Sequence, residues 1–302
     1  MGTHEYEDDP RNENVLISVN GKLFPRNEAK ISVFDAGFLL GDGVWESFRL
    51  HEGTLVFIDD HLDRLFHGAA EISMDPCRTR EEVRGEIDRV ILANDMHDHV
   101  HLRLIITRGV KPTPYQAPWV ISSPPTLVII PEYKKANVKR AIEGIDLVSV
   151  SVRRGGPEVQ NPTINSLSKH NCIAACIEAS KRGGEEGLML DPNGFVSTCN
   201  STHFFMVKEG QVWTSTGEFC LDGITRKKVI DLCGANGIGC FERNFSFEDV
   251  RQSDEAFVTG TFAGLTPVVS FDGHAISEGK RGPLCERLQG LYLGLVKEEC
   301  GV

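Results

Sequence analysis

The sequence predicts an α+β fold in two domains, and three observations lead to this prediction. A chain of 302 residues with 40% hydrophobic and 25% charged residues is long and apolar enough for two packed domains. From about Val15, strand-like and helix-like segments alternate. The apolar pattern then breaks into charge and proline in "PEYKKANVKR", which is typical of a linker. We expect a flexible arm at 1–14, a smaller N-terminal domain at 15–133, a linker at 134–140 and a larger C-terminal domain at 141–302.

The expected N-terminal domain begins with two β-hairpins. "VLISVNGKLF" and "GVWESFRLHEGTLVF" are strand-like, and Gly21 and Gly53 mark their turns. The elements predicted after them are a helix at 58–72, a helix at 79–95 and strands at 101–109 and 125–133. The first of these helices follows an Asp cap and carries apolar residues at helical spacing, namely Leu62, Leu65, Phe66, Ala69 and Ile72.

The expected C-terminal domain repeats the strand-then-helix style without an internal repeat. Its strands include "IDLVSVSV", a hairpin around residue 200 and the buried "EAFVTG". Its helices are expected near 167–182, 225–236 and 283–298.

The composition disfavours several classes of function. The net charge of −11 argues against nonspecific nucleic-acid binding, which depends on basic patches. The nine cysteines include no C-x-x-C pair, so the sequence indicates neither a disulfide framework nor a metal site. The start is too polar for a signal peptide, and no apolar run approaches the roughly 20 residues of a membrane helix. We therefore expect a cytoplasmic enzyme that acts on small molecules.

Lys169 stands before a segment with apolar residues at helical spacing. Positions 172, 173, 176 and 177 are Cys, Ile, Cys and Ile, so the lysine is expected at the head of the apolar face, pointing inward. One interpretation is a lysine that snorkels to solvent, which is the commoner case for this pattern. The other is a desolvated amine with a lowered pKa, which a Schiff-base nucleophile requires.

Two further stretches have the features of an anion-binding cradle. In "LDGITRKKV" a helix is expected to begin at Ile224 and Thr225, where unpaired backbone N–H groups and the helix dipole favour a phosphate. "FVTGTFAG" ends a buried strand in Gly260 and Thr261, and Arg64 offers a counter-charge. Taken alone, such features are more often a capped helix, a strand end and a solvated arginine.

Five segments together resemble one enzyme family in their order and spacing. They are "GDGVWESFRLHEGTLVFIDDHLDRL", Lys169 before its helix, "DPNGFVS" before a strand, "LDGITR" and "DEAFVTGTFAGLTPV". Over about residues 16–275 the chain resembles the fold type IV pyridoxal 5'-phosphate enzymes. This class includes branched-chain and D-amino acid aminotransferases, (R)-amine transaminases and aminodeoxychorismate lyase. The resemblance implies a two-domain D-amino acid aminotransferase-like fold, pyridoxal 5'-phosphate as cofactor and a homodimer.

The resemblance implies roles for individual residues of this chain. Lys169 matches the lysine that forms the Schiff base with the cofactor and moves the proton of the substrate's α-carbon. Trp45 matches an aromatic position beside the substrate. The residues that match phosphate-binding groups of the family are Arg64, Ile224, Thr225, Gly260 and Thr261.

At position 198 the sequence departs from the family pattern. Most members have a glutamate four residues after the glycine of the "NG" turn, where it keeps the pyridine nitrogen protonated; here Thr198 stands there. A neutral hydroxyl can donate to an unprotonated nitrogen but cannot stabilise a pyridinium by charge, so we expect a weaker electron sink. Neighbouring Ser197, Asn200, Ser201 and Thr202 could form a compensating network, or the stretch is simply an uncharged hairpin face.

The signals for the substrate are mixed. Arg103 falls where branched-chain aminotransferases keep an arginine near the substrate carboxylate. The D-amino acid enzymes use an Arg and a His in the loop after "TRG", and the matching residues here are Thr113 and Tyr115. "TRG" itself is shared with the D-amino acid and (R)-amine branches. Arg153 and Arg154 are further candidates for the pocket mouth, or plain surface charge.

The resemblance therefore implies a pyridoxal-phosphate-dependent aminotransferase. It would move an amino group from a branched-chain L- or D-amino acid, or from a primary (R)-amine, to a 2-oxo acid. Two alternatives stay open at this point. One is a lyase of the same fold, similar to aminodeoxychorismate lyase, and the other is a protein that binds the cofactor with little turnover.

Overall fold

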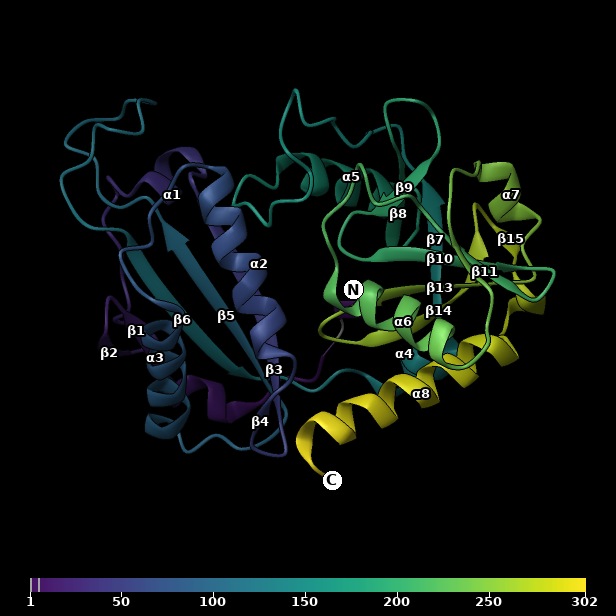
Figure 1. Ribbon diagram of the computed structural model, residues 1–302, viewed down its shortest axis with the longest axis horizontal. Coiled ribbons are helices and arrows are strands. Elements are labelled where there is room, and N and C mark those ends of the chain that lie inside the picture. Colours follow the sequence, from purple (N-terminus) through teal and green to yellow (C-terminus); the bar gives the residue numbers. More distant parts are fainter. Residues whose placement is uncertain (1, 5) are drawn as a thin grey trace. The chain divides into compact units, whose positions relative to one another are not determined.

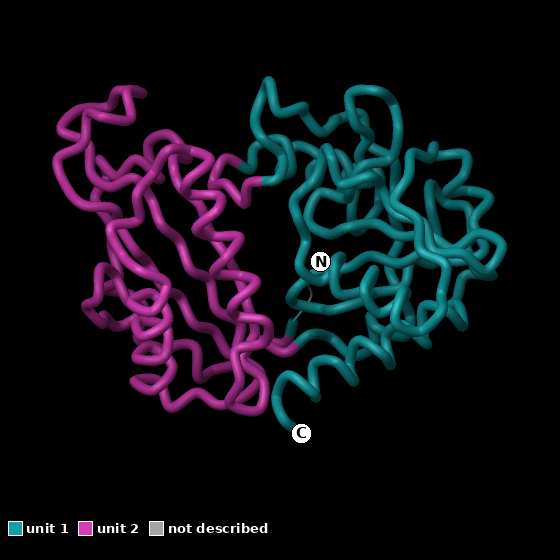
Figure 2. Tube along the Cα trace, viewed as in Figure 1, with its two compact units in different colours: residues 1–6, 136–163, 169–302 teal, residues 7–135, 164–168 magenta. Residues whose placement is uncertain are grey.

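The computed structural model describes residues 2–4 and 6–302 and divides into two compact units. Unit 1 comprises Met1–Tyr6, Ala136–Thr163 and Lys169–Val302, and unit 2 comprises Glu7–Lys135 and Ile164–Ser168 (Figure 2). The division after Lys135 falls inside the expected linker. Helices and strands are mixed in both units, as the predicted α+β class requires (Figure 1).

The elements described below carry the labels of Figure 1. The helices are α1 (Ala36–Leu40), α2 (Ile58–Glu71), α3 (Arg80–Ala93), α4 (Val138–Glu143), α5 (His170–Lys181), α6 (Ile224–Ala235), α7 (Phe247–Arg251) and α8 (Pro283–Cys300). The strands of unit 2 are β1 (Leu16–Val19), β2 (Lys22–Pro25), β3 (Gly43–His51), β4 (Thr54–Leu55), β5 (Val100–Thr107) and β6 (Thr126–Tyr133). The strands of unit 1 are β7 (Ile145–Ser149), β8 (Glu186–Leu190), β9 (Val196–Cys199), β10 (His203–Lys208), β11 (Gln211–Thr214), β12 (Cys240–Glu242), β13 (Glu255–Gly260), β14 (Gly264–Phe271) and β15 (His274–Ala275).

The described strands of unit 2 form an antiparallel sheet in the order β2-β1-β6-β5-β3-β4. Both predicted hairpin turns occur. Each uses two residues with positive φ, Asn20 and Gly21 in the first and Glu52 and Gly53 in the second. This conformation matches the twist of the flanking strands, and glycine adopts it without a steric penalty.

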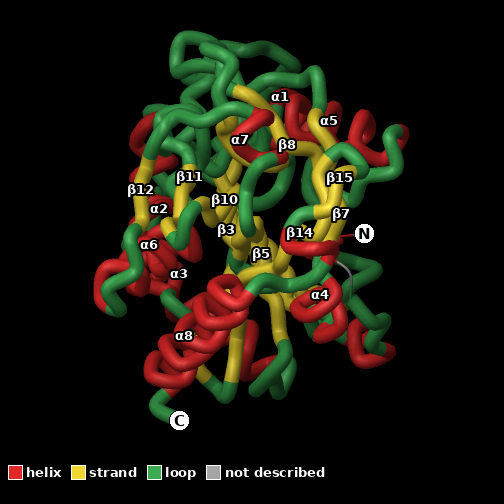
Figure 3. Tube along the Cα trace, turned by 90° about the vertical axis from the view of Figure 1, so that its right-hand side faces the viewer, coloured by secondary structure: helices red, strands yellow, loops and turns green. Residues whose placement is uncertain are grey.

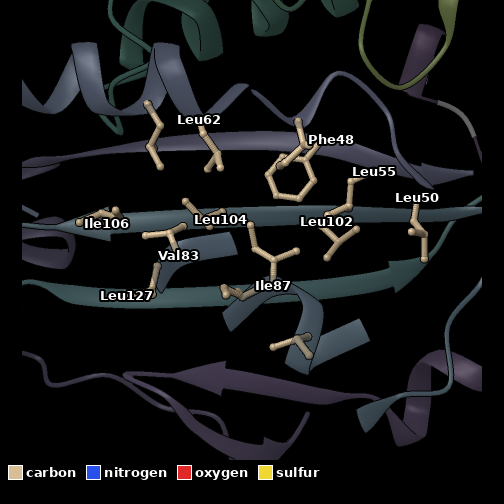
Figure 4. Packing of buried hydrophobic residues seen from close by; sticks show 14 of the residues in the cluster. Phe48, Leu50, Leu55, Leu62, Val83, Ile87, Leu102, Leu104, Ile106 and Leu127 are labelled. Atoms are coloured by element: carbon tan, nitrogen blue, oxygen red, sulfur yellow. The ribbon is translucent and has the colours of Figure 1, made fainter. Parts of the chain in front are cut away.

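One face of this sheet is buried under α2 and α3. From Val44 onward burial alternates along β3, so Val44, Glu46, Phe48 and Leu50 are buried, while Trp45 and the later residues of its face are only partly covered. Figure 4 shows the side chains of this core between the strands and the helices. Burial of each large apolar side chain contributes roughly 1.5–3 kcal/mol. A glutamate among these residues therefore needs buried partners.

Helices α2 and α3 of unit 2 begin in different ways. The capping box of α3 is present, because Thr79 accepts a hydrogen bond from the Glu82 amide (3.2 Å) and Glu82 accepts one from the Thr79 amide (2.7 Å). The Asp cap predicted for α2 is wrong. Its N-cap is Phe57, in the left-handed conformation, and Asp59 lies inside the first turn, where it complements the helix dipole.

The described strands of unit 1 form a mixed sheet in the order β12-β11-β10-β13-β14-β7-β8-β9, with β15 paired to β14. Figure 3 colours these strands yellow and the helices red. Helices α6 and α8 pack on one face, against residues such as Phe205, Phe257 and Leu265. A second apolar cluster, which includes Phe204, Val258 and Phe271, covers the other face. The buried strand predicted at "EAFVTG" is β13.

The expected flexible arm is tied to the fold at several points. Thr3 donates a hydrogen bond to buried Glu186, and Tyr6 forms an antiparallel bridge with Ala136. Residues 10–14 form a 3₁₀ helix, in which Asn12 exchanges hydrogen bonds of 2.9 and 2.8 Å with the Tyr133 backbone. These bonds satisfy backbone groups of a strand edge, which explains why the arm is ordered. Met1 and Glu5 lie outside the described residues.

The expected linker also differs from the structure in its second half. Residues 138–143 form α4, which begins at an Asn137 cap whose side chain accepts from the Lys139 amide at 3.0 Å. Later in the chain, Ile164–Ser168 returns to unit 2. In the described part of the chain, no helix is both long and apolar enough to cross a membrane.

Candidate active site

Lys169 stands where the chain passes from unit 2 to unit 1. The preceding segment pairs with the start of β3: the Trp45 amide donates to the Asn165 carbonyl (2.9 Å), and the Leu167 amide donates to the Gly43 carbonyl (3.0 Å). The Trp45 indole Nε1 donates to the Ser166 carbonyl at 3.1 Å. Lys169 itself is the N-cap of α5 and is half-buried. The backbone therefore fixes Lys169 on both sides.

The expectation that residues 172–177 form the inward face of α5 is wrong. Ile173 is 54% exposed and Ile177 is 51% exposed, whereas Ala175 and Ala179 are buried. A methyl group on Gly187 of β8 would lie 3.2 Å from the Ala175 carbonyl oxygen and 3.3 Å from Ala179 Cβ. The helix therefore packs so close to the sheet that only small residues fit between them.

The start of α6 has the backbone geometry of an anion site. The first helical hydrogen bond runs from the Lys227 amide to the Gly223 carbonyl (2.9 Å), which leaves the amides of the first turn pointing outward. Gly223 is the N-cap, and Ile224 and Thr225 are buried. A side chain at Gly223 would lie 2.4 Å from His203 Cε1, so only glycine fits beneath this ring.

Two buried polar atoms near this helix start have no hydrogen-bond partner among the described residues. They are Nε of Arg226 and Oγ1 of Thr259. Arg226 lies in the first turn of α6, where a positive charge opposes the helix dipole. Thr259 pairs with His203 across β13 and β10, so it faces the same side as the ring packed on Gly223. The Arg226 guanidinium also donates to the Ser215 carbonyl at 2.6 Å and lies 3.3 Å from Glu242, so the groups that fit a bound phosphate best are the outward amides of α6 and the Thr259 hydroxyl.

The end of β13 lies against the turn that follows β9. Gly260 pairs with Gly264, and a methyl group on Gly260 would lie 3.5 Å from Thr202 Cγ2. Thr261 is half-buried directly after the strand. Unit 1 therefore brings the expected phosphate residues Gly260 and Thr261 next to the 198–202 stretch, and that stretch next to the α6 start through His203.

The hydroxyl of Thr198 is bonded within the protein. Thr198 is buried on β9, and its Oγ1 donates to the Thr202 carbonyl at 2.7 Å, which also accepts from the Cys199 amide at 2.9 Å. The Thr202 hydroxyl donates to buried Glu186 at 2.7 Å, and Thr3 donates to the other Glu186 oxygen. The proton of the Thr198 hydroxyl is therefore engaged with the Thr202 carbonyl, and the role of Thr198 toward a cofactor stays a prediction.

The remaining polar groups of the stretch also have partners. Ser197 donates to the Phe219 carbonyl at 2.9 Å, and the Asn200 side chain accepts from the Gly187 amide at 2.7 Å. Arg154 donates to the same Phe219 carbonyl at 3.3 Å, and its Nη1 lies 3.1 Å from Cys172 Sγ in the first turn of α5. Arg154 therefore connects the region of β9 to the helix that Lys169 begins.

In unit 2, Arg64 is held by a buried ion pair. Its Nε and Nη2 each donate to Glu46 at 2.7 Å, and His61 Nδ1 lies 2.8 Å from the same carboxylate. Glu46 is fully buried; burial raises its pKa, but the charge of Arg64 and the hydrogen bond from His61 outweigh burial and lower the pKa to about 2. Burial lowers the pKa of His61, so its imidazole is neutral at pH 7. Arg64 is therefore fixed in one orientation.

Trp45 and Arg103 meet on the other face of the same sheet. The Arg103 guanidinium lies 3.9 Å from the centre of the Trp45 ring. Arg103 pairs with Ser47 across β3 and β5, which places it diagonally beside Trp45. Burial lowers the pKa of Arg103, while the charges of Glu132 and Glu46 oppose that shift. A guanidinium with so high an ordinary pKa keeps its charge at pH 7.

Among the described residues, no contact joins Thr113 or Tyr115 to the pair of Trp45 and Arg103. Both side chains are exposed in the loop between β5 and β6, and Tyr115 is 55% exposed. The loop is instead held by buried Lys111, whose Nζ donates to the Ala117 carbonyl at 2.9 Å.

Sequence reasoning missed several polar residues that determine these arrangements. The sequence could have indicated that Glu46 and His61 are buried, because each is a polar residue at a position that strand or helix periodicity assigns to the core. Glu186 gave no local signal, since its partners Thr3 and Thr202 are distant in sequence.

Comparison with known proteins gives consistent similarities. The profile of the family described as Amino-transferase class IV matches residues 43–271. The chain is 38% identical to the branched-chain-amino-acid aminotransferase-like protein 1 of Arabidopsis thaliana, over 97% of this chain and 52% of that protein. It is 34% identical to the putative branched-chain-amino-acid aminotransferase of Methanocaldococcus jannaschii, over 90% and 93% of the two chains.

Among solved structures, the branched-chain amino acid aminotransferase from Thermobaculum terrenum in its PLP form superposes with a TM-score of 0.84. The two chains are 25% identical, and 95% of each is covered. The chain spans about half the length of the first curated relatives it matches, the two Arabidopsis thaliana proteins.

Proposed function

The chain belongs to the class IV aminotransferase family, and we propose that it is a pyridoxal-phosphate-dependent aminotransferase. We propose that it moves the amino group of a branched-chain L-amino acid to a 2-oxo acid. The observation that carries the substrate class is the Arg103 guanidinium stacked on Trp45 at 3.9 Å. The pair offers a charged group for a carboxylate beside a large apolar surface for a branched side chain.

The start of α6 supports the assignment of the cofactor's phosphate group. The Ile224 and Thr225 amides would donate to it, together with Thr261, and Arg226 adds positive charge close by. Arg64 in unit 2 is a further proposed donor, and its ion pair with Glu46 would fix the guanidinium before the ligand arrives.

Lys169 is the proposed catalytic residue. When bound, the cofactor supplies an electron sink for the α-carbon of the substrate. Lys169 Nζ would bond the cofactor between turnovers, and during turnover it would take the proton from the substrate's α-carbon and return it. The rigid backbone on both sides of Lys169 limits how far this amine can move.

Thr198 would meet the ring nitrogen as a hydrogen-bond acceptor. Because its own proton is bonded to the Thr202 carbonyl, the Thr198 oxygen has only lone pairs left to offer. In this proposal the ring nitrogen therefore carries the proton, without an anionic partner on residue 198. The remaining parts of the proposal are a homodimer and an arginine, Arg154, near the start of α5 as a second carboxylate-binding candidate.

The test is the visible absorption of the purified protein with pyridoxal phosphate. The band of the bound cofactor should disappear with L-leucine or L-valine and return with 2-oxoglutarate. The band should be lost in Lys169→Ala; an unchanged band would disprove the assigned lysine. A band that responds to D-alanine or an (R)-amine but not to L-leucine would disprove the substrate class. Turnover without a 2-oxo acid would indicate a lyase of the same fold.

Arg103→Ala tests the proposed carboxylate contact. Loss of a charge-assisted hydrogen bond costs roughly 1.5–3 kcal/mol, so the KM of both L-leucine and 2-oxoglutarate should rise about 10- to 100-fold. Arg49→Ala is the matched control, because Arg49 lies on the same face of β3 as Trp45. Equal KM values for the two variants would contradict the role of Arg103.

A further inference from the structure

A cluster of metal-binding residue types lies in unit 2, at the turn between β3 and β4. His51 ends β3, Glu52 occupies the turn, and Asp98 lies in the connection between α3 and β5. One ligand atom of each residue lies within 4.8 Å of those of the other two. The proposed aminotransferase reaction uses none of these three side chains.

Backbone hydrogen bonds hold the two segments together. The Gly53 amide donates to the His97 carbonyl at 2.8 Å, and the Glu52 amide donates to Asp98 Oδ1 at 3.4 Å. Glu52 and Gly53 have φ values of 47° and 76°, as a tight two-residue hairpin requires. The ligand-bearing residues are therefore positioned by the fold rather than by chance contact of flexible loops.

The central pair of the cluster is His51 and Asp98. His51 Nδ1 lies 2.8 Å from Asp98 Oδ1, and the two side chains are 20% and 24% exposed. Glu52 is exposed, so its side chain can turn toward the pair.

A second imidazole stands beside this pair. His99 Nε2 lies 3.3 Å from Asp98 Oδ2, and the centres of the His99 and His51 rings are 6.5 Å apart. Nε2 is the ring nitrogen of His99 that faces Asp98, so this imidazole can turn toward an ion bound at the pair and contribute a further nitrogen ligand.

We propose that His51, Glu52 and Asp98 bind one divalent transition-metal ion, with His99 as the fourth ligand. Zn²⁺ takes imidazole nitrogen and carboxylate oxygen at about 2.0–2.2 Å in a tetrahedral arrangement, which sets its ligand atoms roughly 3.3 Å apart. The three atoms lie within 4.8 Å of one another, so rotation of the exposed Glu52 side chain can close the site. Two imidazoles favour Zn²⁺, Co²⁺ or Ni²⁺ over Mg²⁺ and Ca²⁺, which prefer all-oxygen ligands.

The site joins a hairpin to the strand that carries Arg103. Its ligands come from segments 46 residues apart, which explains why sequence spacing gave no metal signal. A bound ion would connect the β3–β4 turn to the start of β5 and so stabilise unit 2. Because the ion binds the folded state, it should raise the Tm of the protein, and the Tm should keep rising with the logarithm of the ion concentration above the Kd.

The test is metal titration of the full-length protein loaded with cofactor. Co²⁺ should give the visible d–d bands of a tetrahedral site, with one ion bound per chain, and Zn²⁺ should displace it. Asp98→Asn should weaken binding about 10- to 100-fold, as loss of a ligand or its partner does. His67→Ala, which removes an exposed histidine of α2, is the matched control and should bind as the wild type does.

Glu52→Ala is a second variant that separates weaker metal binding from loss of the fold. Glu52 is exposed, so its truncation should leave the metal-free Tm unchanged while weakening Co²⁺ binding at least several-fold. Three results would overturn the proposal: no bound Co²⁺, wild-type affinity in both variants, or the intense charge-transfer bands of thiolate ligation, since the chain has nine cysteines. None of these results depends on aminotransferase activity, so the two proposals fail separately.

Discussion

Replacing Glu46 by glutamine should destabilise unit 2 strongly, although the two side chains have nearly the same shape. Glu46 accepts from Arg64 twice and from His61, and it is fully buried. Its pKa of about 2, against a usual 4.5, corresponds to about 3 kcal/mol of stabilisation of the folded state. Removal of one partner from a buried ion pair typically costs about 3–5 kcal/mol, because the other charge stays buried. The N–H groups of the glutamine amide would also face the hydrogen-bond donors of Arg64 or His61, and a donor cannot bond to another donor.

The assay is urea unfolding of Glu46→Gln followed by tryptophan fluorescence. Trp45 is partly buried in unit 2 and Trp213 is partly buried in unit 1, so a change that occurs in the Trp45 signal and is absent from Trp45→Phe reports on unit 2. We expect the free energy of unfolding to fall by about 3 kcal/mol, and the Tm by roughly 10 °C. Asp59→Asn is the matched control. It removes an ion pair to Arg84 of 2.9 Å in which the side chains are 85% and 47% exposed, so it should cost less than about 1 kcal/mol.

The reasoning would be refuted if Glu46→Gln and Asp59→Asn lowered the free energy of unfolding by the same small amount. That result would mean that burial of the Glu46 carboxylate cancels its attraction to Arg64.

Three further predictions concern pH, the helix start and position 198. The contribution of Glu46 to the free energy of unfolding is complete above about pH 4.5 and is lost as the pH falls toward 2. His61 has a lowered pKa in the folded state, so the protein also loses stability as the pH falls below 6.5, the usual pKa of histidine. The urea midpoint should therefore fall between pH 7 and pH 3, and it should fall less steeply in Glu46→Gln. Gly223→Ala should weaken pyridoxal phosphate binding at least tenfold by equilibrium dialysis, because its methyl group would collide with an imidazole. Gly234→Ala in the same helix, with open space around it, should bind normally and gain about 0.5–1 kcal/mol. Thr198→Glu should lower the Tm relative to the wild type, and this difference should shrink on acidification as the added carboxylate is protonated; a difference that does not change with pH would contradict this.

Local signals predicted most elements of the fold correctly. The turns at Gly21 and Gly53 and the helix expected over 79–95 depend on residues within a few positions of one another, and the sequence displays them directly. The Asp cap of α2 was wrong because Phe57 enters the helix from a left-handed conformation, which its residue type does not suggest.

Tertiary packing explains the other errors. The inward face of α5 was misassigned because its contact with Gly187 selects Ala175 and Ala179, and hydrophobicity alone favours the larger isoleucines. The Trp45 and Arg103 pair depends on strand register, which sequence spacing cannot supply. The candidate site residues themselves came from resemblance to a family rather than from local physics.

The hydrogen bonds around Thr202 offer a physical reason for a neutral side chain at position 198. Thr202 receives a hydrogen bond from Thr198 at its carbonyl and donates one from its hydroxyl to Glu186, so a buried carboxylate already lies close to this turn. The register pairs Thr198 with Met189, three residues from Glu186 on β8, so the side chains of Thr198 and Glu186 leave the sheet on opposite faces and are linked through Thr202. A carboxylate at 198 could not donate to the Thr202 carbonyl, which would keep the Cys199 amide as its donor. Threonine keeps this hydrogen bond while the Thr202 hydroxyl stays directed at Glu186, so the neutral side chain at 198 and the order of this turn belong to one arrangement.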